Sequence, residues 1–292
     1  MGEAKKNKKA PQDLKRGRRP ISKRDHKYSR GVVAIVAGSK LFPGAALLTV
    51  GGARQGGAGY VKFLDGTSVT TQLVISHYPD VAPITSISNE KIDALVVGPG
   101  ATTLRSLPEK IPVVLDSGAL SLASKTTASR DPEQIIVVTP HEGELGELGF
   151  SIPAYQGSQQ TIDAQRKDVA QRIADQLNVI CVLKGHRTVI AAPQRRILVN
   201  SKLVDSELVE SKRPNSILID STGGSELATA GSGDILAGLV GAFLASWKPL
   251  TYSDAQRVVW DAVHLHSAAG AHAARAKKSV VATDILESLA YC

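Results

Sequence analysis

Cysteine, aromatic residues and long apolar runs are all scarce in this sequence, and each scarcity excludes a class of protein. Only Cys181 and Cys292 occur among 292 residues, so neither a disulfide framework nor a cysteine-based zinc site can be built. Aromatic residues make up 4% of the chain, which favours a layered α/β fold over a surface that stacks single-stranded nucleic acid. The longest apolar stretch, about residues 235–247, is too short and too rich in glycine and alanine to span a membrane. We therefore expect a soluble, cytoplasmic protein with no membrane partner.

Two common nucleotide-binding motifs are absent as well. Neither GxxxxGK[ST] nor GxGxxG occurs anywhere in the chain, which argues against P-loop and Rossmann sites.

The net charge of +8 is concentrated at the N-terminus. Residues 1–30 contain 12 lysines or arginines and three acids, a balance of +9 that leaves −1 for residues 31–292. A basic segment with few apolar residues predicts a disordered, solvated tail over residues 1–30, followed by one domain over residues 31–292. An arm for nucleic acid or a membrane surface is the alternative, and we expect nucleic-acid binding to be at most a side role.

Short apolar runs alternate with turn-rich and helical segments along the rest of the chain. The runs are residues 32–37, 94–97, 113–115, 135–138 and 179–183. This alternation predicts an α/β fold with a mainly parallel sheet and helices on both faces. Residues 188–220 predict antiparallel strands at one edge, and helices are expected near 235–246 and 253–276. In such a sheet, ligands bind at the carboxyl ends of the strands.

The first of these two helices opens with the sequence Ala-Gly-Ser-Gly-Asp at residues 230–234. Glycines at a helix start let the backbone N–H groups of Gly231, Ser232 and Gly233 converge on an anion, which the helix dipole also favours. A carboxylate at Asp234 suits a base that takes a proton from a hydroxyl attacking a phosphoryl group. A glycine turn with Asp234 capping the helix is the structural alternative.

The segment LATAGSGDILAGLVGAFLA, residues 227–245, resembles the signature of the ADP/ATP-dependent NAD(P)H-hydrate dehydratases, a branch of the ribokinase-like superfamily. Sugar kinases of that superfamily carry a related Gly-Ala-Gly-Asp turn, and its thiazole and pyrimidine kinases usually place Cys at the position of Asp234. The resemblance covers about residues 32–289 in six segments, and it implies a ribokinase-like three-layer fold.

The resemblance also assigns contacts to the hydrated nicotinamide nucleotide. These contacts are Ala45 in a Pro-Gly-Ala-Ala segment, Gly100 in a Val-Gly-Pro-Gly turn, His141 in a Thr-Pro-His-Glu-Gly-Glu motif, and Asp234. Turns or tight helix packing would explain the glycine-rich segments without any ligand. Glu144 would position magnesium or phosphate, or serve as an ordinary acid at a helix start. Asp116 is retained from a family Asp-Ala-Asp-Ala-Leu segment, whereas Gly118 replaces its second Asp.

Residues 183–189, LKGHRTV, resemble the family's Lys-Gly-x-x-Thr-Val hairpin, against which the adenine nucleotide lies. The resemblance therefore assigns ADP or AMP binding to Lys184, Gly185, His186, Arg187, Thr188 and Gly233. Lysine offers charge for a phosphate and glycine lets the backbone approach a ligand, while a plain β-turn is the alternative. We expect His264, His266 and His272 to serve helix packing or contact solvent rather than metal.

The resemblance implies ADP-dependent dehydration of hydrated NADH and NADPH (NADHX and NADPHX), with release of AMP and phosphate. Asp234 would act as the base, the N–H groups of Gly231, Ser232 and Gly233 would hold the developing charge, and Mg²⁺ would bridge the nucleotide phosphates. ATP is the alternative donor, although the lack of an attached epimerase domain favours ADP. A small-molecule kinase for a vitamin precursor or sugar is the rival. A homotetramer and a separate NAD(P)HX epimerase as functional partner are also implied.

Overall fold

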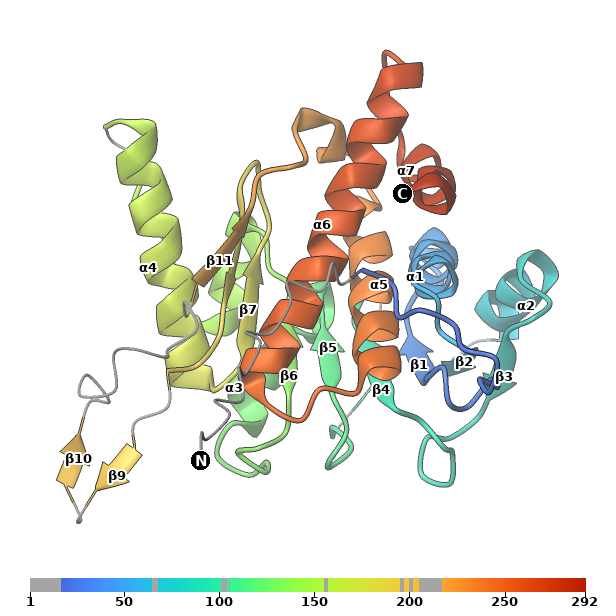
Figure 1. The fold of residues 1–292 in the computed structure, drawn as a ribbon, viewed down its shortest axis with the longest axis horizontal. Coiled ribbons are helices and arrows are strands. Elements are labelled where there is room, and N and C mark those ends of the chain that lie inside the picture. Colours follow the sequence, from blue (N-terminus) through green and yellow to red (C-terminus); the bar gives the residue numbers. More distant parts are fainter. Residues whose placement is uncertain are drawn as a thin grey trace, which may run out of the picture.

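A nine-stranded sheet forms the centre of the molecule (Figure 1). This computed structural model describes residues 17–64, 68–100, 104, 106–154, 157–194, 197–199, 202–204 and 217–292. The strands of the sheet lie in the order β11-β8-β7-β6-β5-β4-β1-β2-β3. They are β1 Val32–Val36, β2 Tyr60–Leu64, β3 Ala82–Ile84, β4 Ala94–Val97, β5 Val113–Leu115, β6 Ile136–Val138, β7 Ile180–Leu183, β8 Thr188–Ala191 and β11 Ile217–Asp220.

In the part of the chain that the structure describes, seven α-helices and several 3₁₀ helices cover this sheet. The helices are α1 Pro43–Gln55, α2 Ser68–His77, α3 Ser121–Thr126, α4 Gln159–Leu177, α5 Ser232–Trp247, α6 Tyr252–Ala276 and α7 Ala282–Ser288. The 3₁₀ helices include η1 Ser117–Ala119, η2 Glu142–Leu148, η4 Ser225–Leu227 and η5 Leu289–Tyr291. No helix in the described part of the chain is both long enough and apolar enough to cross a bilayer.

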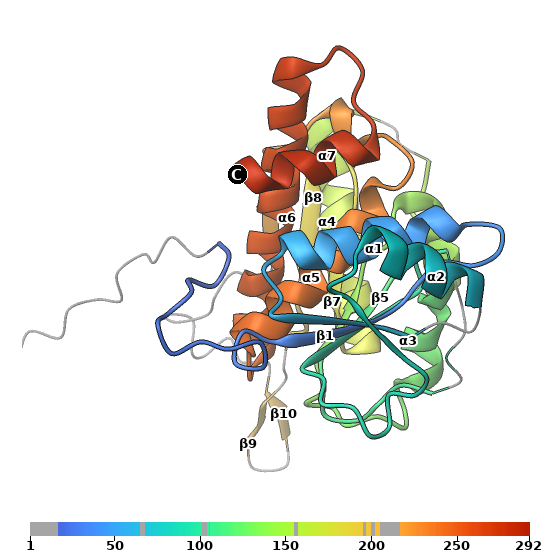
Figure 2. The same cartoon turned by 90° about the vertical axis from the view of Figure 1, so that its right-hand side faces the viewer.

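Alternate residues of the strands pack into two separate cores, one on each face of the sheet. Val33 and Ile35 join the core formed with α1, α5, α6 and α7, whereas Ala34 and Val36 join the core formed with α3 and α4. Figure 2 shows α1, α5, α6 and α7 gathered on one side of the strands. Strands buried on both faces account for the continuous apolar runs in the sequence, because neither face is left to solvent. The predicted α/β fold is confirmed.

The predicted antiparallel edge is confirmed only in part. The strands from β1 to β7 all pair in parallel, while β8 and β11 extend the sheet as antiparallel neighbours. The segment at Ile197–Val199, expected in that edge, instead pairs as β9 with β10, Lys202–Val204, in a separate hairpin. The expected helices correspond to α5 and α6; α5 begins three residues earlier and ends one residue later than predicted, and α6 begins one residue earlier.

Residues 17–30, assigned from the sequence to a disordered tail, instead pack against the domain. The Arg18 guanidinium donates to the carbonyls of Gln55 and Cys292, each at 2.7 Å, and also to that of Leu289. The Trp247 indole N–H donates to the Gly17 carbonyl at 3.0 Å. This segment, which we call the N-terminal strap, therefore joins the ends of α1, α5 and the C-terminal turn. The predicted disorder of residues 1–16 lies outside the described residues.

Candidate active site

The carboxyl ends of five neighbouring strands carry the residues that the sequence singled out. In sheet order, β7, β6, β5, β4 and β1 lead into Lys184, Thr139, Asp116, Gly98 and Ala37. The strand order reverses between β1 and β4, because β2 continues on one side of β1 and β4 on the other. Ligands in open α/β sheets bind at such a reversal, beyond the carboxyl ends of the strands.

Ala45 and Gly100 lie together at this reversal. The Gly38 N–H donates to the Pro99 carbonyl at 2.6 Å, which joins the loop after β1 to the loop after β4. A Cβ placed on Gly100 would lie 2.8 Å from the Ala45 Cβ, so the two backbones approach closely. Gly98 has φ +123°, and a Cβ there would lie 1.8 Å from the Asp116 carbonyl oxygen, so only glycine fits.

A lysine bound to two carboxylates lies beside this reversal. Lys184 Nζ is 2.9 Å from Asp116 Oδ1 and 3.6 Å from Glu144 Oε2. Asp116 is 1% exposed and also accepts hydrogen bonds from the hydroxyls of Thr139, at 2.6 Å, and Ser117, at 3.0 Å. Burial lowers the pKa of Lys184, but the two carboxylates outweigh burial and leave its pKa above the ordinary value. The lysine is therefore a fixed cation.

Asp234 lies in the first turn of α5 and completes this cluster of charges. Burial, followed by the charge of Asp116, raises the pKa of Asp234 to about 7, even though Lys184 acts in the opposite direction. Glu144 adds a smaller rise in the same pKa. A carboxylate whose pKa lies near neutrality can accept a proton from a substrate and release it again, as a general base must.

The backbone at the start of α5 takes the conformation that an anion site requires. Gly231 is the N-cap with φ +91°, and a Cβ there would lie 2.4 Å from Leu48 Cδ1. Ser232 and Gly233 begin the helix. The Ser232 N–H donates to the Thr229 carbonyl at 3.2 Å, whereas the Gly233 N–H belongs to the first turn, where no intrahelical acceptor exists. A Cβ on Gly233 would lie 3.3 Å from Lys184 Nζ, so the lysine faces the helix start.

The turn between β7 and β8 is held from behind by a buried arginine. Arg166 on α4 is 6% exposed, and its Nη2 donates to the carbonyls of Leu183 and Lys184, each at 3.1 Å, and of Arg187 at 3.3 Å. The same guanidinium pairs with Glu142. A Cβ on Gly185 would lie 2.6 Å from Arg166 Nη2, which explains why glycine occupies this position.

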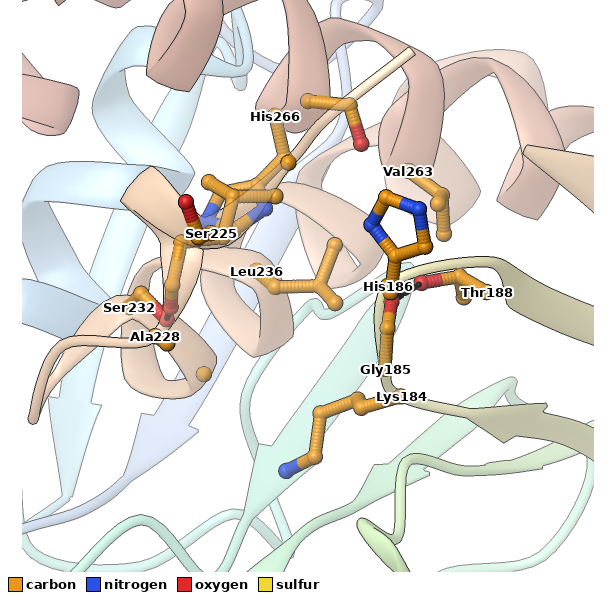
Figure 3. A pocket seen from close by; sticks show the side chains of 14 residues that line it. Lys184, Gly185, His186, Thr188, Ser225, Ala228, Ser232, Leu236, Val263 and His266 are labelled. Carbon is orange, nitrogen blue, oxygen red and sulfur yellow. Dashed lines mark hydrogen bonds between the residues drawn. The ribbon is translucent and has the colours of Figure 1, made fainter. Parts of the chain in front are cut away.

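A pocket of about 360 Å³ lies between this turn and the start of α5. Figure 3 shows Lys184 at one end and His266, on α6, at the other. The lining residues are Lys184, Gly185, His186, Thr188, Gly224, Ser225, Leu227, Ala228, Ser232, Gly233, Leu236, Val263, His266 and Ser267. Six of the predicted nucleotide or anion residues are therefore together in one pocket.

The remaining predicted residues lie outside this lining. Arg187 pairs with Asp163 on α4. His141 has a side chain that is 58% exposed, and its Nδ1 accepts from the Gly143 N–H at 3.0 Å, which makes it the N-cap of η2. The Glu144 side chain accepts from the His141 N–H at 2.9 Å, which closes the capping box.

Arg166 and His266 were missed as site residues in the sequence. Arg166 sits in an amphipathic helix where arginines normally face solvent, and no local pattern marks the one that turns inward. His266 was expected in helix packing; it is indeed buried, but it lines the pocket. An available signal was the spacing of Val263, His266 and Ser267, which places all three on one helical face.

The described residues supply no complete cage for a metal ion. No group of three or more His, Cys, Asp or Glu side chains suited to a metal occurs among them. Mg²⁺, however, is usually held by one or two carboxylates together with substrate phosphates and water. Glu144 and Asp234 fit that smaller requirement, because both carboxylates lie at the Lys184 end of the pocket.

The NAD(P)H-hydrate dehydratase family model matches residues 33–205 and 203–290. The chain belongs to the NAD(P)H-hydrate dehydratase family. It is 33% identical, over 77% of its length, to the bifunctional NAD(P)H-hydrate repair enzyme Nnr of Mycobacterium tuberculosis, of which it covers 43%. The chain spans less than half of the length of such bifunctional relatives. It is 30% identical, over 83% of its length, to the ADP-dependent (S)-NAD(P)H-hydrate dehydratase of Bacillus subtilis, of which it covers 81%.

Solved structures agree with this membership. The crystal structure of the Bacillus subtilis ADP/ATP-dependent NAD(P)H-hydrate dehydratase, co-crystallised with ATP and Mg²⁺, superposes with a TM-score of 0.71 and 26% identity. The match covers 93% of this chain and 92% of that one. A ribokinase-like superfamily protein from Enterococcus faecalis superposes with a TM-score of 0.68 and 21% identity, over 92% and 89% of the two chains. That likeness establishes the ribokinase-like fold.

Proposed function

We propose that this chain dehydrates hydrated NADH and NADPH back to NADH and NADPH at the expense of ADP, with ATP as the alternative donor. The observation that carries the proposal is Asp234, a carboxylate in the first turn of α5 whose pKa is raised to about 7 by burial and by the charge of Asp116. Family relatives named as ADP-dependent and ADP/ATP-dependent dehydratases support the choice of nucleotide.

The nucleotide would bind in the pocket beside the β7–β8 turn. Lys184 at one end offers a cation for phosphate, and Gly233 at the start of α5 lies next to it, because a Cβ there would lie 3.3 Å from Lys184 Nζ. Gly185, His186 and Thr188 line the pocket towards its other end. We assign Arg187 a supporting role, because it pairs with Asp163 instead of lining the pocket.

The hydrated nicotinamide would lie at the Ala45–Gly100 reversal, with His141 at its exposed rim. Asp234 takes the proton from the ring hydroxyl as the hydroxyl oxygen attacks the terminal phosphorus of ADP. The bond between that phosphorus and the bridging oxygen breaks, and AMP leaves. The backbone N–H groups of Gly231, Ser232 and Gly233 stabilise the negative charge that develops on the transferred group.

The second step is an elimination. The C–O bond to the new phosphate breaks, a neighbouring ring proton is lost, and the double bond of the reduced nicotinamide is restored. Phosphate is a far better leaving group than hydroxide, which explains why a dehydration uses a kinase-like fold.

Magnesium fits this site as an ion carried by the nucleotide phosphates. Glu144 and Asp234 are the residues that would hold it, and it would neutralise phosphate charge during transfer. A homotetramer, a cytoplasmic location and a separate epimerase partner stay predictions from the family resemblance.

The reaction is tested by incubating the purified chain with hydrated NADH, Mg²⁺ and either ADP or ATP. We expect the near-ultraviolet absorbance of the reduced nicotinamide to return only when nucleotide is present, with one AMP released per NADH when ADP is the donor. A kinase of the same fold would leave a stable phosphorylated product and restore no absorbance. Mass spectrometry of the products from vitamin-precursor alcohols and sugars would detect that rival.

A further inference from the structure

We propose that His266 selects adenine nucleotides by accepting a hydrogen bond from the exocyclic amino group of the base. The inference rests on the proposed function for the class of ligand in the pocket. The inference adds a residue that distinguishes one purine base from another, on α6 and outside the turn between β7 and β8.

The first observation is an unpaired nitrogen in the wall of the pocket. His266 is 4% exposed, and its Nε2 is buried with no hydrogen-bond partner within the described part of the chain. Buried polar atoms are nearly always paired, because an unpaired one loses its hydrogen bonds to water without replacement. Since His266 lines the pocket, a ligand atom is the partner that this nitrogen lacks.

The second observation concerns the proton on the ring. Burial lowers the pKa of His266 to about 4, so the imidazole is neutral at physiological pH and has one donor and one acceptor nitrogen. We place that proton on Nδ1, so that Nε2 presents a lone pair and its partner is a hydrogen-bond donor.

The third observation is the polarity of the pocket. Lys184 and the start of α5 attract phosphates to one end, whereas His266 lies at the other end (Figure 3). Val263 and Leu227 are apolar members of the same lining. A nucleotide with its phosphates at Lys184 places its base towards His266. Adenine offers an amino donor there. Guanine and hypoxanthine offer a carbonyl acceptor, which would leave two buried acceptors facing each other.

The test compares the affinities of AMP and of inosine monophosphate for the full chain by titration calorimetry. Four proteins are compared: wild type, His266→Phe, His266→Gln and the control His264→Gln. His264 lies on the same helix but bonds to Asp220 and Thr222, each at 3.0 Å, and does not line the pocket. We expect wild type and His264→Gln to prefer AMP by about 10- to 100-fold. His266→Phe should lose most of that preference, and His266→Gln, whose amide oxygen can accept, should keep part of it.

Two outcomes would overturn the proposal. If His266→Phe loses affinity for AMP and for inosine monophosphate equally, His266 serves packing alone. If the substitution lowers the affinity for AMP but not the affinity for 2′- or 3′-deoxy-AMP, His266 contacts the ribose. Nitrogen NMR of the wild-type protein gives an answer even if the variants unfold. Adding AMP should shift the His266 Nε2 resonance, whereas adding inosine monophosphate should not. These readouts need no turnover. A chain that selects AMP through His266 but restores no NADH would contradict the proposed function and leave this inference standing.

Discussion

At the scale of single residues, the site depends on how four charges share one small volume. Asp116, Glu144 and Asp234 surround Lys184, so one cation faces three carboxylates. Two of these carboxylates pair with the lysine, and burial together with the charge of Asp116 raises the pKa of the third, Asp234. Environment, and not residue type, thus gives Asp234 the pKa that suits the base we propose it to be.

The pH dependence of activity should follow this carboxylate. Because the base must be ionised, we expect kcat/KM for the hydrated nucleotide to fall tenfold per pH unit below about pH 7. Glu144→Gln removes a charge that raises the pKa of Asp234, so its acid limb should move to lower pH. Glu147→Gln, an exposed neighbour on the same 3₁₀ helix, should leave the profile unmoved. An unshifted profile in Glu144→Gln would contradict this coupling.

Stability should change in the opposite direction to activity. The folded-state pKa of Asp234, about 7, lies above its ordinary value of 3.8, so the ionised carboxylate destabilises the fold above pH 7 and has no such effect below pH 4. We expect Asp234→Asn to raise the free energy of unfolding by about 1–3 kcal/mol at about pH 8, and by much less near pH 4. Denaturant unfolding at the two pH values measures this. An equal gain at both would assign the effect to something other than ionisation.

The sequence predicted some of these residues better than others. Asp234, Lys184 and the glycines of the α5 start carry local motifs. Lys184 and Gly233 line the same pocket, and the charge of Lys184 acts on the pKa of Asp234. The contact between Lys184 and Asp116 joins residues 68 positions apart, and no local pattern contains it. Arg166 was missed for the same reason, whereas the spacing of Val263, His266 and Ser267 puts His266 on one helical face but does not show that this face lines a pocket.

At the scale of elements, Arg166 on α4 holds the turn between β7 and β8 by hydrogen bonds to its backbone carbonyls. Arg166→Met would leave three carbonyls and Glu142 without their donor, so we expect a loss of about 2–5 kcal/mol in unfolding free energy. The affinity for AMP should also fall, since the turn that lines the pocket loses its support. Chemical denaturation and calorimetry measure the two effects.

Arg172→Met on the same helix is the matched control. Arg172 forms an exposed pair with Asp168 at 3.7 Å, so its loss should change stability by less than about 0.5 kcal/mol. Equal effects from the two substitutions would show that Arg166 has no special role in holding the turn.

Helices α1 and α5 carry Ala45 and Asp234, and they touch through glycines. A Cβ on Gly238 would lie 2.0 Å from the Thr49 carbonyl oxygen. We therefore expect Gly238→Ala to destabilise the protein by about 2–4 kcal/mol, despite the better helix propensity of alanine. Gly146→Ala, where no heavy atom lies within 4 Å of the new Cβ, should be close to neutral. Thermal unfolding of both variants would decide, and a neutral Gly238→Ala would contradict the close approach.

Elements with strong apolar runs were the easiest to predict. The buried strands β1, β4, β5, β6 and β7 were found within one or two residues. Strand β2 has a lysine at its centre, Lys62, which pairs with Glu90, and β3 has only three residues. Both lack the apolar pattern of a buried strand. The Ile197–Val199 segment has that pattern but pairs within its own hairpin, a choice that depends on tertiary contacts and not on propensity.

At the scale of the whole molecule, the N-terminal strap joins residues 17–30 to the end of α1 and to the C-terminal turn. Arg18→Ala removes donors from three carbonyls, so we expect a loss of about 1–3 kcal/mol in unfolding free energy. Arg24→Ala, an exposed residue in the same strap, serves as the control and should change stability by less than about 0.5 kcal/mol. Equal melting temperatures for wild type and Arg18→Ala would contradict a stabilising strap.

Charge composition correctly located the basic segment but not its structure. Residues 17–30 have too few apolar side chains to predict order, and they are held by hydrogen bonds to backbone carbonyls that composition does not reveal.

The central claim is that Asp234 is the base of an ADP-dependent dehydration. It is tested most directly by the rate at which hydrated NADH regains its near-ultraviolet absorbance, compared between wild type and Asp234→Asn at equal, saturating nucleotide. We predict a fall in kcat of at least about 10³-fold, with AMP affinity kept within a fewfold of wild type. A variant that restores NADH at a rate close to that of wild type would contradict the account.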